Sequence, residues 1–323
     1  MARAFLSEDN PFHILVPVWG ENYTETFLNY LVPSLLAEGN LPAWPYSAHT
    51  VLQIATRQED ALQMEASPFF QRLRHFVPIQ FQIFEFAQFK HLQIGQAFEA
   101  KYQLLNDIMG LLLQQAMAVS AHVIPLVSDV VLADNFFSYL RQALEAETVL
   151  LLMAGPRLAL TAKNSLETGR KNGTLALSPR QLNQRIFSDL HPHEQACFID
   201  APVFSQWPSH VYYWQNPRLV ISRWFHLHPF FLYCPQVVQG QRTVSIEADL
   251  LNQYQGRREQ IRLIQESETA ACSVSTLAED MPAWGKQSSL SERQQMLLDF
   301  GEHKCLPLQR WFFGHSIAFR LDN

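Results

Sequence analysis

The chain has few cysteines, and their spacing forms no metal-binding pattern. Its 323 residues include four of them, none arranged as a Cys-x-x-Cys pair: Cys197, Cys234, Cys272 and Cys305. This spacing argues against a structural zinc site. Scattered single thiols are typical of the reduced core of a cytosolic protein, so we expect a cytoplasmic location.

Charge and long apolar runs are also scarce. Charged residues make up 17 % of the chain and hydrophobic residues 48 %, a balance that excludes a disordered protein. The net charge of −6, without any basic block, argues against a nucleic-acid duplex as partner. The sequence starts without a basic-then-apolar leader, and no run approaches the roughly 18 apolar residues of a membrane span. We therefore expect no transmembrane segment.

Three common catalytic motifs are missing. The sequence has no Gly-x-x-x-x-Gly-Lys phosphate loop, no Gly-x-Gly-x-x-Gly fingerprint and no Gly-x-Ser-x-Gly elbow. Their absence weakens the kinase, dinucleotide-oxidoreductase and esterase interpretations of the chain.

Short apolar runs alternate with amphipathic segments through the first half. Strands are expected at residues 13–18, 50–56, 79–85, 121–127 and 149–153. Helices are expected after Thr24, after Ser67, and over residues 102–119 and 136–147. This rhythm predicts an α/β fold, a Rossmann-like, mostly parallel sheet flanked by helices with right-handed crossovers.

The second half has a different character and predicts a mixed α+β arrangement. A helix-start pattern precedes residues 180–190, and an aromatic, histidine-rich stretch follows. We expect residues 1–160 and 161–277 to form two halves of one domain, with residues 278–323 as an extension packing on it. The Trp311-Phe312-Phe313 tail is expected to pack on the domain, and contact with a membrane surface or a partner is the alternative.

Asp129, His226 and His228 are the candidate metal ligands. Asp129 directly follows the fourth expected strand, where a carboxylate can hold a divalent cation that bridges two phosphates. His226 and His228 are two residues apart, so in an extended segment they face the same side. The alternatives are a turn cap for Asp129 and a hydrogen-bonded aromatic core for the histidines.

Other polar and aromatic residues are candidates for ligand contact. Glu247 and Asp249 alternate along an expected strand, which suits a general base and a partner; the alternative is a solvent-facing strand edge or a helix cap. Lys101 and Tyr102 can meet a phosphate, ribose or base, or lie on a solvated helix face. Trp19, after the first strand, can stack a base or act as a packing cap.

Several of these segments together resemble the nucleotide-sugar half of GT-A-fold glycosyltransferases. The segments are Val16 to Glu21, Thr56 with Asp60, Lys101-Tyr102, and Ser128-Asp129. More narrowly, the chain resembles a bacterial group of glycosyltransferase-like proteins. The segments that carry this narrower resemblance are Ser128-Asp129, Ala133-Asp134-Asn135, Trp207 to His210, Phe225 to Pro229, and Glu247-Ala248-Asp249. The resemblance spans residues 12–277.

The resemblance implies a nucleoside-diphosphate sugar, most simply a UDP-sugar, above a GT-A-like sheet. Its nucleotide would be held by five residues: Trp19, Thr56, Asp60, Lys101 and Tyr102. A divalent metal, Mn²⁺ or Mg²⁺, would lie on Asp129, with His226 or His228 completing its ligands.

The resemblance also implies an acceptor side and a base. Trp207 and His210 would line the site of a glycan, glycolipid or related acceptor. Asp249 is the first candidate for the base that deprotonates the acceptor hydroxyl, and Glu247 is the second. The chain differs from most of these enzymes in having one carboxylate, Asp129, where they have Asp-x-Asp. A catalytically silent homologue is therefore one alternative.

Two further functions stay open. The first is a metal-dependent hydrolase built on His226 and His228, although such motifs usually lie near an early strand. The second is a non-catalytic interaction protein on a transferase scaffold.

Overall fold

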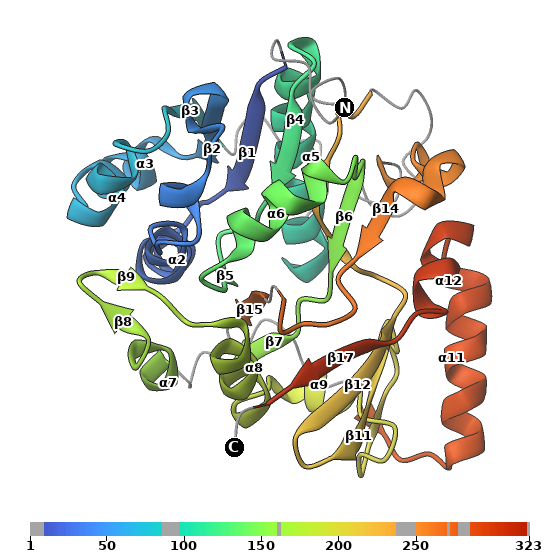
Figure 1. Cartoon of the computed structure of the whole chain (residues 1–323). Coiled ribbons are helices and arrows are strands. Elements are labelled where there is room, and N and C mark those ends of the chain that lie inside the picture. The colour runs from blue at the N-terminus through green and yellow to red at the C-terminus, as the bar shows by residue number, and fades with distance from the viewer. Residues whose placement is uncertain are drawn as a thin grey trace.

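A seven-stranded sheet organises the first half of the protein (Figure 1). The computed structural model describes residues 10–85, 97–159, 163–236, 250–269, 272–276 and 285–321. The sheet runs in the order β14-β6-β13-β4-β1-β2-β3. Its strands are β1 (Phe12–Pro17), β2 (Thr50–Thr56), β3 (Ile79–Ile83), β4 (His122–Pro125), β6 (Leu150–Met153), β13 (His228–Leu232) and β14 (Ile261–Leu263). All neighbours pair in parallel except β13, which runs antiparallel between β4 and β6.

Helices cover both faces of this sheet, because its strands are apolar on both sides. Ile14 and Val16 pack with the segment formed by α1 (Glu21–Thr26), a π-helical turn and α2 (Val32–Leu35), and with α6 (Phe136–Glu145). Leu15, between them in sequence, faces the opposite way and packs with α5 (Ala97–Ala118). Strands buried on both faces are expected for parallel sheets. The predicted α/β class, with a mostly parallel sheet flanked by helices, is confirmed.

The remaining strands form smaller sheets. The largest is antiparallel, in the order β11-β12-β17, and lies beside α11 and α12 in Figure 1. The strands of these smaller sheets are β5 (Val130–Leu132), β7 (Arg157–Ala159), β8 (Arg170–Lys171), β9 (Thr174–Leu175), β10 (Phe204–Ser205), β11 (His210–Asn216), β12 (Leu219–Trp224), β15 (Cys272–Thr276), β16 (Gly285–Lys286) and β17 (Ile317–Arg320). The remaining helices are α3 (Gln58–Glu65), α4 (Pro68–Leu73), α7 (Lys163–Glu167), α8 (Pro179–Ser188), α9 (Pro192–Gln195), α11 (Leu290–Lys304) and α12 (Pro307–Phe313). The second half is thus mixed α+β, as expected.

Capping explains where two of these helices begin. Ser178 accepts a hydrogen bond at its hydroxyl from the backbone N–H of Gln181, and the Gln181 side-chain oxygen accepts one from the backbone N–H of Ser178. Ser289 and Glu292 make the same reciprocal pair at the start of α11. Each pair satisfies two backbone donors that the first turn leaves free.

The first helix begins earlier than the sequence indicates. The prediction placed Thr24 at its cap, but the helix begins at Glu21 and Thr24 is fully buried within it. Gly20 makes the early start possible, because its φ of 82° turns the chain directly from β1 into the helix. The prediction also missed α3, a largely polar helix.

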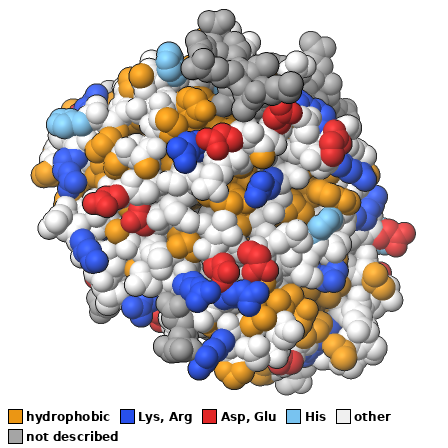
Figure 2. All heavy atoms as spheres, viewed as in Figure 1, with side chains coloured by type: hydrophobic (Ala, Val, Ile, Leu, Met, Phe, Trp, Pro, Cys, Tyr) orange, Lys and Arg blue, Asp and Glu red, His pale blue; other side chains and the backbone are white. Residues whose placement is uncertain are grey.

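The Trp311-Phe312-Phe313 tail packs against other described parts of the chain. Phe312 is buried in the larger core cluster, and Phe313 stacks on Phe225 with ring centroids 3.9 Å apart. Charges of both signs are interspersed over the coloured part of the face in Figure 2. The division at residues 160 and 277 stays a prediction.

Candidate functional site

The carboxyl ends of the parallel strands bring several predicted site residues to one edge of the sheet. Trp19 follows β1, Thr56 ends β2, and Asp129 follows β4. His228 reaches the same edge from the opposite direction, because it begins the antiparallel β13 and pairs with Met153 at the end of β6. Ligands of open α/β sheets bind outside this edge, where the chain switches from one side of the first strand to the other. Here the switch lies between β1 and β4.

Trp19 is half-buried at this edge. Its ring meets Phe84, which follows β3, edge to face with centroids 5.8 Å apart. Thr56 is fully buried, and its hydroxyl has no hydrogen-bond partner within the described structure. The structure therefore shows packing for Trp19 and leaves its contact with a base as a prediction.

Asp60 connects the ends of β1 and β2. Its carboxylate accepts a hydrogen bond from the Gly20 N–H at 2.9 Å and two from the Arg57 guanidinium, at 2.6 and 3.0 Å. Burial opposes ionisation, but Arg57 and Gly20 outweigh it and lower the pKa of Asp60. An ionised Asp60 thus positions the Trp19-Gly20 turn. This contact gives it a structural role beside its predicted role in nucleotide binding.

Asp129 and His228 lie toward the same corner of the sheet. Asp129 is half-buried in the turn between β4 and β5. Leu232 pairs with Val123, so the antiparallel direction of β13 carries His228 toward the turn that holds Asp129. The sequence had no signal for this strand insertion, which is what relates the two residues.

His226 and His228 do not lie on one strand, which corrects the prediction of an extended segment. β12 ends at Trp224, the chain bends through His226, and β13 begins at His228. The His226 Nε2 is 3.9 Å from the Cys305 sulfur. The half-buried imidazole of His226 therefore lies in the bend, and the half-buried imidazole of His228 lies at the start of β13.

Both imidazoles are neutral at pH 7. Burial and the nearby His210 lower the pKa of His226 to about 4. Burial and the charge of Arg157 lower the pKa of His228 to about 4. Neutral imidazole is the form that binds metals. Across the described residues, however, no three or more His, Cys, Asp or Glu side chains are grouped so that they could hold a metal ion. Metal binding therefore stays a prediction.

The two predicted acceptor residues have different environments. Trp207 is 40 % exposed and packs edge to face with Phe300. His210 is 3 % exposed and stacks on Trp224 with ring centroids 4.0 Å apart. A side chain this buried can act on an acceptor only through its neighbours.

His210 belongs to a buried polar cluster centred on Glu194. The Glu194 carboxylate, 1 % exposed, lies 2.9 Å from the His210 Nε2 and accepts a hydrogen bond from the Tyr212 hydroxyl at 2.6 Å. The other ring nitrogen of His210 lies 3.1 Å from the Ser209 hydroxyl. The sequence analysis missed Glu194 and Tyr212. The one available signal was that residues 210 and 212 share a face of β11.

Glu194 and His210 form an ion pair. Burial disfavours charge on both, but His210 lowers the pKa of Glu194 to about 2. Against the same burial, the Cys197 sulfur and Glu194 raise the pKa of His210 to about 10. The adjacent His193 is different: burial lowers its pKa to about 4, and its Nδ1 has no hydrogen-bond partner in the described part of the chain.

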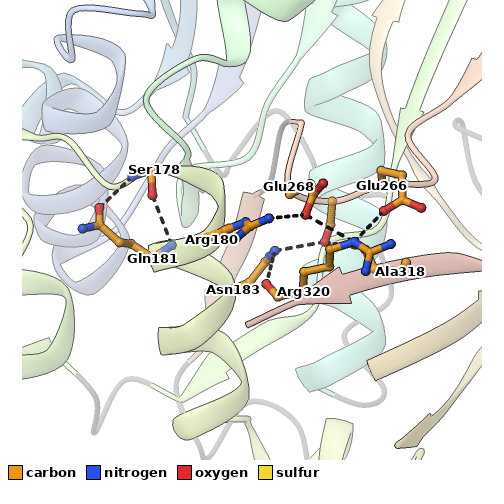
Figure 3. Close-up of polar contacts among 9 residues, drawn as sticks. Ser178, Arg180, Gln181, Asn183, Glu266, Glu268, Ala318 and Arg320 are labelled. Atoms are coloured by element: carbon orange, nitrogen blue, oxygen red, sulfur yellow. Dashed lines mark hydrogen bonds and ion pairs between the residues drawn. The ribbon is translucent and has the colours of Figure 1, made fainter. Parts of the chain in front are cut away.

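A second, exposed network follows β14 (Figure 3). Arg320 pairs with Glu266 and Glu268 at 3.2 and 3.3 Å, and Arg180 of α8 pairs with Glu268 at 3.2 Å. Beneath it, the Asn183 amide donates to the Ser267 hydroxyl at 3.0 Å. These contacts join α8, β17 and the loop after β14.

Four predicted residues are not placed in detail. Glu247 and Asp249 lie outside the described residues. Lys101 and Tyr102 belong to α5, where the description of these two residues is limited to the backbone. The roles predicted for these four residues stay predictions. None of the described helices is long and apolar enough to cross a membrane.

Comparison with known proteins gives partial similarities of fold. No protein-family model matches the chain, and no curated protein sequence matches it. Among solved structures, residues 1–349 of S. aureus TarS match at a TM-score of 0.28 and 10 % identity, covering 46 % of this chain and 36 % of that one. Mouse xyloside xylosyltransferase 1 in its apo form matches at 0.26 and 11 %, covering 50 % and 57 %.

A Bacillus anthracis protein assigned as a glucose-1-phosphate thymidylyltransferase, in complex with a sucrose, also matches. Its TM-score is 0.28 at 9 % identity, and the match covers 45 % of this chain and 55 % of that one. In all three cases this chain spans well under two thirds of the other protein. Similarities at this level carry no argument about the reaction.

Proposed function

We propose that this chain is a glycosyltransferase that moves a sugar from a nucleoside-diphosphate donor, most simply a UDP-sugar, to a glycan, glycolipid or related acceptor. The observation that carries the proposal is that Trp19, Asp129 and His228 all come from strand ends at the carboxyl edge of the sheet, beside the β1–β4 switch point. An aromatic ring, a carboxylate and an imidazole at such an edge suit a base, a diphosphate and its counter-charge.

The half-exposed Trp207 supports the acceptor side of this proposal. Sugars pack on flat aromatic faces, and Phe300 supports the Trp207 ring from its edge. We propose that Trp207 contacts the acceptor directly, and that His210, held by Glu194, supports the wall behind it.

Sugar transfer requires one bond to form and one to break. The acceptor hydroxyl oxygen bonds to the anomeric carbon while the bond from that carbon to the donor diphosphate breaks, and the diphosphate keeps the electron pair. If the configuration inverts, the hydroxyl proton passes to a carboxylate, for which we propose Asp249, with Glu247 second. A Mn²⁺ or Mg²⁺ ion on Asp129 and His226 or His228 would supply positive charge to the leaving diphosphate.

Calorimetry on the full chain tests this function. UDP, GDP and their sugar conjugates are titrated with Mn²⁺ and, separately, with a chelator. We expect at least one nucleoside diphosphate to bind, and Asp129→Asn to weaken the part of that binding that depends on Mn²⁺. Failure of every nucleotide and nucleotide sugar to bind under both conditions would refute the proposal.

Metal analysis, turnover assays and partner-binding assays on the same protein distinguish the rival functions. Tightly bound zinc with esterase or amidase turnover would favour a hydrolase that uses His226 and His228. Partner binding that survives Asp129→Ala and His228→Ala, with no turnover in any assay, would favour an interaction protein.

A further inference from the structure

Arg157 lies near the carboxyl edge of the sheet and forms no ion pair with a carboxylate among the described residues. It begins β7, four residues beyond Met153, which pairs with His228. The side chain is half-buried, and its guanidinium has no hydrogen bond or ion pair with any residue that the structure describes. Its backbone is fixed, because the Arg157 carbonyl accepts a hydrogen bond from the His191 N–H at 2.9 Å.

Most comparable arginines of this protein are paired. Arg57 binds Asp60, Arg170 binds Glu167, and Arg320 binds Glu266. A guanidinium has five donors in a fixed plane. No guanidinium nitrogen of Arg157 is among the buried side-chain atoms of the described residues that lack a hydrogen-bond partner, so its donors are accessible to solvent and to a bound anion.

The carboxylate of the adjacent buried cluster, Glu194, already has partners. Arg157 lies next to this cluster, because its carbonyl binds the N–H of His191 at the start of α9, the helix that carries Glu194. Glu194, however, contacts His210 at 2.9 Å and Tyr212 at 2.6 Å. One carboxylate thus faces two cations, His210 and Arg157. An anion bound at Arg157 would therefore not have to displace Glu194 from its two partners.

We propose that Arg157 binds the diphosphate of the nucleotide donor, an inference that rests on the proposed function. The planar fork of a guanidinium matches two phosphate oxygens, and its charge does not depend on pH in the physiological range. Its position beside the β6 end places it next to His228 and across β13 from Asp129. Arg157 thus contributes a fixed positive charge where the leaving diphosphate develops negative charge.

Binding of UDP, uridine and inorganic pyrophosphate to the full chain tests this role. Arg157→Gln is expected to weaken UDP and pyrophosphate binding by roughly 10- to 100-fold, the range for a charged hydrogen bond. Uridine, which lacks phosphate, should bind the variant as it binds the wild type. Arg157→Lys keeps the charge without the fork and should give an intermediate loss.

Arg180→Gln is the matched control, because Arg180 is an exposed arginine bound to Glu268. It should leave all three affinities unchanged. Thermal unfolding of each variant is measured alongside, and Arg157→Lys carries the test if Arg157→Gln does not fold. A lowered melting temperature with an unchanged ratio of UDP to uridine affinity would assign Arg157 a structural role and overturn the inference.

The outcomes separate this inference from the function on which it rests. Equal UDP affinity in wild type and Arg157→Gln overturns the role of Arg157 while the donor function stands. Pyrophosphate binding that depends on Arg157, with no nucleotide bound by the wild type, overturns the donor function and leaves an anion site. Absence of all binding to the wild type overturns both.

Discussion

Removing Glu194 should destabilise the protein by several kcal/mol. Its carboxylate is 1 % exposed and His210 is 3 % exposed, so Glu194→Ala leaves a buried imidazolium and the Tyr212 hydroxyl without their acceptor. Breaking a buried ion pair from one side costs about 3–5 kcal/mol. The unfolding free energy, measured by denaturant titration at pH 6, should fall by this amount.

An exposed carboxylate provides the control. Glu268 also contacts two cationic side chains, Arg180 and Arg320, but these are 54 % and 44 % exposed. Such surface pairs contribute about 0–1 kcal/mol, so Glu268→Ala should change little. If the two variants lose the same stability, the Glu194 pair does not behave as a buried ion pair and the reasoning fails.

The pH dependence gives the same prediction a second readout. The folded-state pKa of His210, about 10, exceeds its ordinary value of 6.5, so its contribution is full below pH 6.5 and is lost as the pH rises toward 10. Glu194 has a folded-state pKa of about 2 against 4.5, so its contribution is full above pH 4.5 and is lost as the pH falls toward 2. The stabilisation by this pair should therefore be greatest between pH 4.5 and 6.5, and both slopes should flatten in Glu194→Ala.

Three further predictions concern stability and turnover. Gly39→Ala should destabilise the protein by about 1–3 kcal/mol in denaturant titration, because the added Cβ would lie 2.9 Å from the Asp134 carbonyl oxygen. Gly256→Ala, with no atom within 4 Å of its Cβ, should leave the midpoint within error, and equal losses would contradict this steric argument. Asp60→Asn should lower the free energy of unfolding by about 1–3 kcal/mol, because it weakens the buried charged hydrogen bonds to Arg57 and Gly20. An unchanged midpoint of urea unfolding would count against this. Trp207→Ala should raise the KM for acceptor without lowering the melting temperature, because the ring is 40 % exposed; unaltered acceptor kinetics would remove it from the site.

The sequence predicted the sheet well where apolar runs are continuous. Residues 50–56 form β2 within those bounds, since Leu52 and Ile54 face one core and Ala55 faces the other. It missed α3 because polar residues such as Gln58 and Glu59 carry little apolar periodicity. That helix forms because Asp60 is held in place by Arg57 and Gly20, a contact between segments 40 residues apart.

The candidate site was less predictable than the fold. Asp129 could be placed at a strand end from its local sequence, but its relation to His228 depends on β13 entering the sheet from the second half. Glu194 lies two residues after Pro192 in a short polar segment and looks like a surface acid, yet it is buried with partners 16 and 18 residues away. Neither relation has a local signature, because both arise from pairing between distant segments.

The antiparallel strand β13 also constrains when the central sheet can form during translation. It fills the space between β4 and β6, which are therefore not neighbours until residues 228–232 have been synthesised. While a ribosome is still producing the second half, both of those strands expose unpaired backbone edges to other nascent chains. Completion of the sheet waits for β14, at residues 261–263. A fragment ending near residue 160 would therefore leave a gap in the middle of its own sheet.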